Sequence, residues 1–191
     1  QARNQLTSIR EMKKDHIEGY FQTIRDQAIT FSNDRMIIEA MKDFKPAFIN
    51  FRNEMPDSEQ NLENWKSGLA AFYQKEFSEE YARRNPLQAS KPLLDLGELD
   101  SNSIALQYHY IGANSHPLGR KDGLSISPDG TTYSRLHQRY HPHIRDFLKK
   151  FGYADIFLVD LDSGDIVYSV SKELDYSTSL VDAPYARTVI G

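Results

Sequence analysis

Two histidines four residues apart have the spacing in this chain that most readily suggests chemistry. His137 and His141 fall within a segment of helical pattern, and two imidazoles at that spacing can share one metal ion. His143 follows Pro142, which redirects the backbone and makes a third ligand awkward. No nearby Asp or Glu completes a zinc motif. The sequence therefore predicts no metal site and favours solvent-tolerant histidines beside a helix kink.

Two arginines in the same segment suggest a second kind of chemistry. Arg135 and Arg139 are also four residues apart, and Tyr133 and Tyr140 stand close to them. Two guanidinium groups with tyrosine hydroxyls are suited to holding a carboxylate, as in amino acids or organic acids. The alternative is that both arginines pair with Asp or Glu on the surface.

Further candidates lie on and beside an expected β-hairpin. Residues 156–159 and 166–170 are rich in β-branched and aromatic side chains, and residues 160–165 between them are typical of a tight turn. Alternation along the first strand favours core packing for Phe157. The candidate ligand-binding residues in this part of the chain are Tyr153, Asp155, Tyr168, Lys172 and Asp175.

Composition excludes several classes of protein. The chain has 191 residues, of which 39% are hydrophobic and 12% aromatic, so it can bury a core. It has no cysteine, which excludes disulfide frameworks and Cys-ligated zinc. A net charge of −4 gives no basic footprint for nucleic acid. Because no phosphate-binding loop or hydrolase motif is present either, we expect neither an enzyme nor a cofactor.

Apolar residues at steps of three and four predict a mostly helical chain. Asp34 and its neighbours can cap a second helix, which Pro46 should kink or restart. Helical period returns at 62–81 and again, in a shorter helix, at 101–113, before an irregular loop at 114–130. An N-terminal helix of about 30 residues is predicted by a stripe of Leu6, Ile9, Ile17, Tyr20, Phe21, Ile24, Ala28 and Phe31.

Several blocks of sequence resemble a known class of domains. In the last of them, a helical segment with Tyr-Ser-Arg-Leu-His-x-Arg-Tyr-His-Pro leads into Gly-Tyr-x-Asp-Ile-Phe-Leu-Val-Asp and then Gly-Asp-Ile-Val-Tyr-Ser. Together the blocks resemble the extracytoplasmic sensor region of bacterial methyl-accepting chemotaxis proteins and related receptors, with its PAS-like, Cache-type domain. They occupy residues 9–27, 39–44, 105–114, 133–142 and 147–180.

The resemblance implies an α+β fold that is predominantly helical. Residues 1–130 would form a helical sensor region that begins with a long juxtamembrane-type helix. Residues 131–191 would form a helix and a β-hairpin, the N-terminal part of a PAS-like domain. Because a PAS-like sheet has more strands than the two readable here, we expect a truncated domain, whose exposed sheet edge would recruit another chain or be shielded by a helix.

The resemblance also implies a function. We expect the periplasmic input domain of an inner-membrane chemoreceptor, a homodimer that binds a small molecule, with a carboxylate favoured by the arginines. No apolar run approaches the roughly 20 residues of a membrane span, so the spans would lie outside this piece. Two alternatives stay open: a metal-dependent hydrolase that uses His137 and His141, and a structural helical dimerisation module.

Overall fold

The computed structural model describes residues 2–56, 58–84 and 96–182, and within them the chain is predominantly helical with one small antiparallel sheet. The α+β, predominantly helical fold expected from the sequence is confirmed. The chain divides into two compact units, residues 1–40 and residues 41–191. Residues on both sides of position 130, where we expected a boundary, belong to the second unit. Residues 183–191 of the expected PAS-like part lie outside the described residues.

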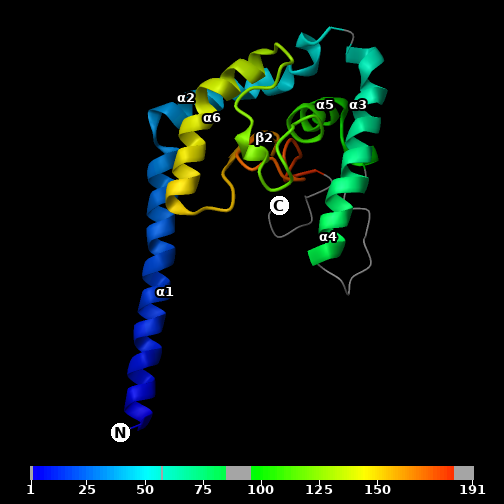
Figure 1. The fold of residues 1–191 in the computed structure, drawn as a ribbon. Helices are drawn as coiled ribbons and strands as arrows, with labels where there is room; N and C mark the ends of the chain where they lie inside the picture. The colour runs from blue at the N-terminus through cyan, green and yellow to red at the C-terminus, as the bar shows by residue number, and fades with distance from the viewer. Residues whose placement is uncertain (1, 57, 85–95, 183–191) are drawn as a thin grey trace. The chain divides into compact units, whose positions relative to one another are not determined.

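The first unit is dominated by α1 (Ala2–Ser32), a single long helix shown in blue in Figure 1. Its apolar stripe predicted a helix of this extent, yet Leu6 is 68% exposed and Phe21 is 63% exposed. Asp34 then caps α2 (Arg35–Ile49), because its Oδ1 accepts a hydrogen bond of 2.8 Å from the backbone N–H of Met36. Within the described part of the chain, no helix is long and apolar enough to cross a membrane.

Two prolines lie inside helices without ending them. Pro46 is part of α2, and Pro142 is part of α6 (Thr132–Phe151), which continues to a glycine C-cap at Gly152. The helix is therefore continuous through Pro142, the residue at which we expected a kink. Buried side chains before and after the proline, including His141 and Ile144, hold both halves of α6 against the core.

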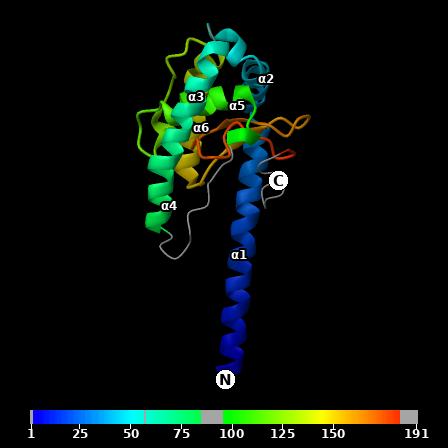
Figure 2. The same ribbon diagram turned by 90° about the vertical axis from the view of Figure 1, so that its right-hand side faces the viewer.

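Helices of the second unit pack beside one another at a glycine. α3 (Ser58–Phe72) lies next to α5 (Ser101–Gln107) and the π-helical turn η4 (Tyr108–Gly112), as Figures 1 and 2 show. A Cβ atom at Gly68 would come within 2.7 Å of the Tyr108 ring, so glycine permits this close approach. The remaining helical elements are η1 (Arg52–Glu54), the π-helical turn η2 (Tyr73–Phe77), α4 (Ser78–Arg84), η3 (Leu96–Glu98) and η5 (Lys121–Gly123).

The hairpin consists of β1 (Phe157–Val159) and β2 (Ile166–Ser169), which pair antiparallel with Leu158 opposite Tyr168. All four residues of β2 are buried, and the ring of Phe44 on α2 lies 5.1 Å from the ring of Tyr168. Of the two outcomes that we expected, pairing with another chain or shielding by a helix, the contact with α2 corresponds to the second.

Side chains also occupy the outer edge of β2. The hydroxyl of Tyr133 donates to the carbonyl of Val167 at 2.8 Å, and Lys172 Nζ donates to the carbonyl of Ser169. These groups stand where a further strand would pair. They satisfy carbonyls that an open sheet edge would leave free, so this part of the edge is closed by the chain itself.

Candidate functional site

Seven ionisable side chains meet in the buried centre of the second unit, and we call them the polar cluster. They come from η4, α6, β2 and the segment that follows β2, and each is at most 2% exposed. Neighbouring rings of the cluster lie 4.3–6.0 Å apart between centroids. The members are Tyr110, Tyr133, His137, His141, Tyr168, Lys172 and Tyr176.

The helical period of α6 explains three of these positions. Tyr133, His137 and His141 follow one another at intervals of four residues, so they lie on one face of the helix. Thr131 fixes the start of that face, because its side-chain oxygen accepts from the backbone N–H of Ser134 at 3.2 Å. The spacing that suggested a shared metal ion therefore places both histidines in the core.

Hydrogen bonds define the tautomer of each histidine. His137 Nδ1 lies 2.8 Å from the carbonyl oxygen of Ser125, and because a carbonyl can only accept, Nδ1 carries the proton. His141 Nε2 donates in the same way to the carbonyl of Asp122 at 2.8 Å, so its Nδ1 accepts from the hydroxyl of Tyr168 at 2.7 Å. The lone pair on His137 Nε2 is buried and has no hydrogen-bond partner.

The two imidazoles are stacked and uncharged. Their centroids are 4.3 Å apart, with 21° between the ring planes. Burial, and then the charge of Lys172, lowers the pKa of His137 well below its usual range, and the same two causes lower the pKa of His141 to about 3. Our expectation of solvent-tolerant histidines is wrong, since these side chains are 0% and 1% exposed. No group of three or more potential metal ligands occurs in the described ranges.

Lys172 is the cationic member of the polar cluster. Its Nζ lies 4.7 Å from the ring centre of Tyr168, 5.5 Å from that of Tyr176 and 5.8 Å from that of Tyr110. It also donates to the carbonyls of Ser169 and, at 3.4 Å, of Val170. Burial lowers the pKa of Lys172 to about 7, so the amine is close to half protonated at neutral pH.

A chain of hydroxyl groups links the tyrosines to the sheet. Tyr176 donates to the hydroxyl of Tyr133 at 3.0 Å, and Tyr133 donates onward to Val167. On another side of the cluster, the hydroxyl of Tyr110 shares a hydrogen bond of 2.8 Å with Ser134. Burial raises the pKa of Tyr176 well above its usual range, so these hydroxyls keep their protons.

Two predicted aspartates have different surroundings. The carboxylate of Asp155 accepts from the backbone N–H groups of Ile156, Val170 and Ser171 at 2.7–3.0 Å, so it fixes the ends of the two strands. Asp175 has a buried Oδ1 without a hydrogen-bond partner. Burial raises the pKa of Asp175 to about 6.

The structure does not assemble the cradle of arginines and tyrosines that we predicted. Arg135 donates to the carbonyl of Gly130 at 2.6 Å at the start of α6, and the guanidinium of Arg139 lies 5.0 Å from the centre of the Tyr140 ring. The hydroxyl of Tyr140 instead donates to Asp43 at 2.6 Å. Among the arginines whose side chains the structure describes, none is buried.

Tyr153 lies outside the polar cluster, and the cluster contains two residues that the sequence analysis missed. Tyr153 is half-buried and stacks on Phe147, with ring centroids 6.0 Å apart. Tyr110 and Tyr176 belong to the polar cluster but were not among the predicted site residues. Tyr110 stands in the aromatic run Tyr-His-Tyr at residues 108–110, which is the one signal that could have indicated it.

No family model matches the chain, and no similar curated protein or solved structure is found.

Proposed function

We propose that this chain is the extracytoplasmic input domain of a transmembrane receptor of the chemotaxis type. It is a non-enzymatic sensor that binds a small molecule at or beside the polar cluster and passes the change through its N-terminal helices. The proposal is supported by the resemblance of the sequence blocks and by the way the polar cluster is connected to α2. Localisation on the periplasmic side of the inner membrane is part of the same proposal.

The observation that carries the proposal is the contact between the polar cluster and α2, the helix that follows α1. The ring of Phe44 on α2 lies 5.1 Å from the rings of both Tyr133 and Tyr168. The preceding residue, Asp43, accepts the hydroxyl of Tyr140 on α6. A ligand that shifts these tyrosines changes the packing of α2, and couplings between such sites are typically ~1–3 kcal/mol.

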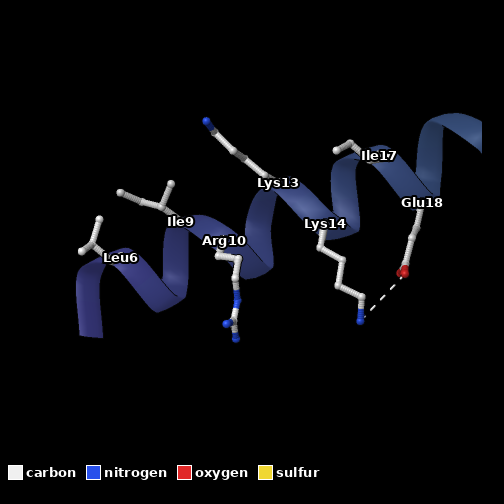
Figure 3. Close-up of a pocket in the computed structure, with 7 residues that line it drawn as sticks. All are labelled: Leu6, Ile9, Arg10, Lys13, Lys14, Ile17 and Glu18. Atoms are coloured by element: carbon white, nitrogen blue, oxygen red, sulfur yellow. Dashed lines mark ion pairs between the residues drawn. The ribbon is translucent and has the colours of Figure 1, made fainter. Parts of the chain in front are cut away.

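We further propose that a second copy of the chain pairs with α1. An open groove runs along this helix, as Figure 3 shows. Leu6, Ile9, Lys13 and Ile17 lie on one side, and Arg10, Lys14 and Glu18 lie on another. Lys14 and Glu18 form an ion pair of 3.8 Å. An apolar seam flanked by charges of both signs is what two pairing helices require, and a second copy presents the same seam.

The two alternatives find less support in the geometry. A hydrolase that uses His137 and His141 would need ring nitrogens open to a metal ion or water, and both nitrogens of His141 already have hydrogen-bond partners. A purely structural dimerisation module would account for α1 but would give the buried polar cluster no role.

A ligand screen on the purified chain tests the sensory proposal. Amines, amino acids and organic acids are screened by thermal shift, and each active compound is then titrated by calorimetry. We expect at least one compound to bind saturably, with an affinity that falls in Tyr168→Leu and is unchanged in Arg139→Ala, which alters an exposed side chain of α6. Metal-dependent hydrolysis without any such binding would overturn the proposal.

The coding sequence on either side of the chain gives an independent test. A receptor of this type requires apolar spans of about 20 residues beside its input domain. We expect two such spans to flank this chain, and a gene without them would contradict the proposed location.

A further inference from the structure

We infer that Tyr110, Tyr168 and Tyr176 form a binding cage for a small organic ammonium ion, and that the protein's own Lys172 occupies this cage in the present structure. The inference deepens the proposed function, on which it rests for its biological use, because it names the chemical class of the sensed molecule. The cage itself stands on the geometry of these four side chains.

Three tyrosine rings surround one ammonium group. Each ring centre lies within 4.7–5.8 Å of Lys172 Nζ, inside the range at which a cation is attracted to an aromatic face. The other buried lysine of the described residues, Lys121, has one ring contact, with Phe72 at 4.5 Å. Its Nζ donates to the carbonyl of Asn114 at 2.8 Å, which ties it to its own loop.

The acceptors in the cage specify a primary ammonium group. Lys172 Nζ directs N–H groups to the carbonyls of Ser169 and Val170. His137 packs against the same tyrosine rings, 4.9 Å from Tyr110 and 5.6 Å from Tyr168, and its Nε2 lone pair is unused. Because carbonyls and a neutral imidazole nitrogen need N–H donors, a quaternary ammonium would fit the cage less well than an amine or the amino group of an amino acid.

The backbone of Lys172 indicates how the cage can be vacated. Its φ angle is +59°, in the left-handed region that residues other than glycine rarely adopt. Glu173, the next residue, is exposed. A return of Lys172 to an ordinary φ would withdraw its side chain from the rings without unfolding a helix or a strand, and the vacant cage would then admit a ligand.

The experiment removes the internal cation and supplies a free one. Lys172→Ala deletes the side chain beyond Cβ, and n-propylammonium has the three carbons and the amino group that are lost. Melting temperatures of this variant are measured with n-propylammonium chloride, with n-propanol, and with sodium chloride at the same ionic strength. We expect the melting temperature to rise saturably with n-propylammonium and to rise much less with n-propanol.

Two controls decide whether the cage causes the rise. Adding Tyr168→Leu to Lys172→Ala removes one ring, and the affinity for n-propylammonium should fall by about tenfold. Lys121→Ala removes the other buried lysine, which lies outside the cage. In this variant n-propylammonium should raise the melting temperature no more than n-propanol does. The inference would be overturned if both compounds raised the melting temperature of Lys172→Ala equally. It would also be overturned if n-propylammonium raised the melting temperatures of Lys172→Ala and Lys121→Ala equally.

If Lys172→Ala does not fold in buffer, it is refolded in the presence of each compound. Recovery of folded protein with n-propylammonium but not with n-propanol supports the cage, and any other result contradicts it. Rescue of Lys172→Ala with no ligand for the wild-type chain would support the cage and count against the sensory function. Saturable ligand binding to the wild-type chain, without rescue of Lys172→Ala by n-propylammonium, would support the sensory function and count against the cage.

Discussion

At the scale of single residues, the polar cluster keeps most of its ionisable groups uncharged. Burial raises the pKa of Tyr168 and Tyr176 well above the usual tyrosine range. It lowers the pKa of His137 and His141 below the usual histidine range. Lys172, with a pKa of about 7, is the group whose charge changes near neutral pH. Charging any of these groups in the core is unfavourable unless a partner stabilises the charge, whether the charge comes from protonating a histidine or lysine or from deprotonating a tyrosine.

Because burial lowers the pKa of both histidines, we expect the stability of the fold to rise from acid to neutral pH. His141 has a pKa of about 3 in the folded chain and an ordinary value of 6.5, so between these pH values the unfolded chain binds more protons. His137 shifts in the same direction, whereas Asp175, raised from 3.8 to about 6, acts oppositely over a narrower window. Urea unfolding at several pH values should show the free energy of unfolding increasing between pH 4 and pH 6.5. A flat or falling profile would contradict this assignment.

Tyr168→Phe should destabilise the fold by about 1–3 kcal/mol. The change removes the hydroxyl that donates to His141 Nδ1 and leaves a buried acceptor without a partner. Tyr20→Phe, on the exposed surface of α1, loses the same atom where water can replace it and should be nearly neutral. Chemical denaturation of both variants measures the difference, and similar values for the two would mean that the Tyr168 hydroxyl contributes little.

Sequence reasoning identified part of the polar cluster but not its environment. Helical spacing correctly placed His137 and His141 on one face, and Tyr168 and Lys172 were named as candidates. The burial of that face could not be deduced locally, because it depends on Phe44 and on Tyr110, which come from distant parts of the chain. The arginines were named as candidate ligand groups because their charge is visible in the sequence, while their exposure is not.

At the scale of elements, local patterns predicted the helices and the hairpin well. The extent of α1, the cap at Asp34 and the two strands follow from apolar period, capping residues and turn composition. The helix at residues 133–151 was also predicted, with a kink expected at Pro142. A proline disfavours a helix interior locally, and the packing of a buried face on both sides outweighs that cost here.

Two glycine substitutions should have opposite effects on helix stability. Gly152 caps α6 with a φ of +72°, and no atom lies near its missing Cβ, so Gly152→Ala should cost about 1 kcal/mol through backbone conformation alone. Gly19 lies inside α1 with equally open surroundings, and Gly19→Ala should increase helix stability by roughly 0.5–1 kcal/mol. Thermal unfolding of the two variants is followed by circular dichroism. Melting temperatures that shift in the same direction in both variants would contradict the assigned backbone conformations.

At the scale of the whole molecule, the chain contains a buried polar cluster in one unit and a largely exposed helix in the other. The second unit contains the polar cluster. The first unit consists mainly of α1, and most of the apolar side chains of this helix are solvent-exposed in the single chain. Isolated helices of this kind gain most of their stability from packing an apolar face. We therefore expect that the chain associates with a second copy and that α1 carries the contact.

Ile17→Lys should shift the chain from dimer to monomer. Ile17 lies in the apolar seam of α1 and is 55% exposed, so a lysine there would place two like charges across the pairing surface. Gln22→Lys introduces the same side chain on the opposite face of the helix and should leave the dimer intact. Sedimentation equilibrium across a dilution series gives the masses. A wild-type monomer at high concentration would contradict the dimer.

The Lys172 amine is buried within the tyrosine cage and is close to half protonated at neutral pH, and the titration of its side chain tests both properties. Lysine Cε signals of the isotope-labelled wild-type chain are followed by NMR as the pH is raised, with Lys172→Met used to assign the residue. We predict that the Lys172 signal titrates with a midpoint near the pKa of about 7 that burial produces. A midpoint at the ordinary lysine pKa of 10.5 would contradict the lowered pKa assigned to this buried amine.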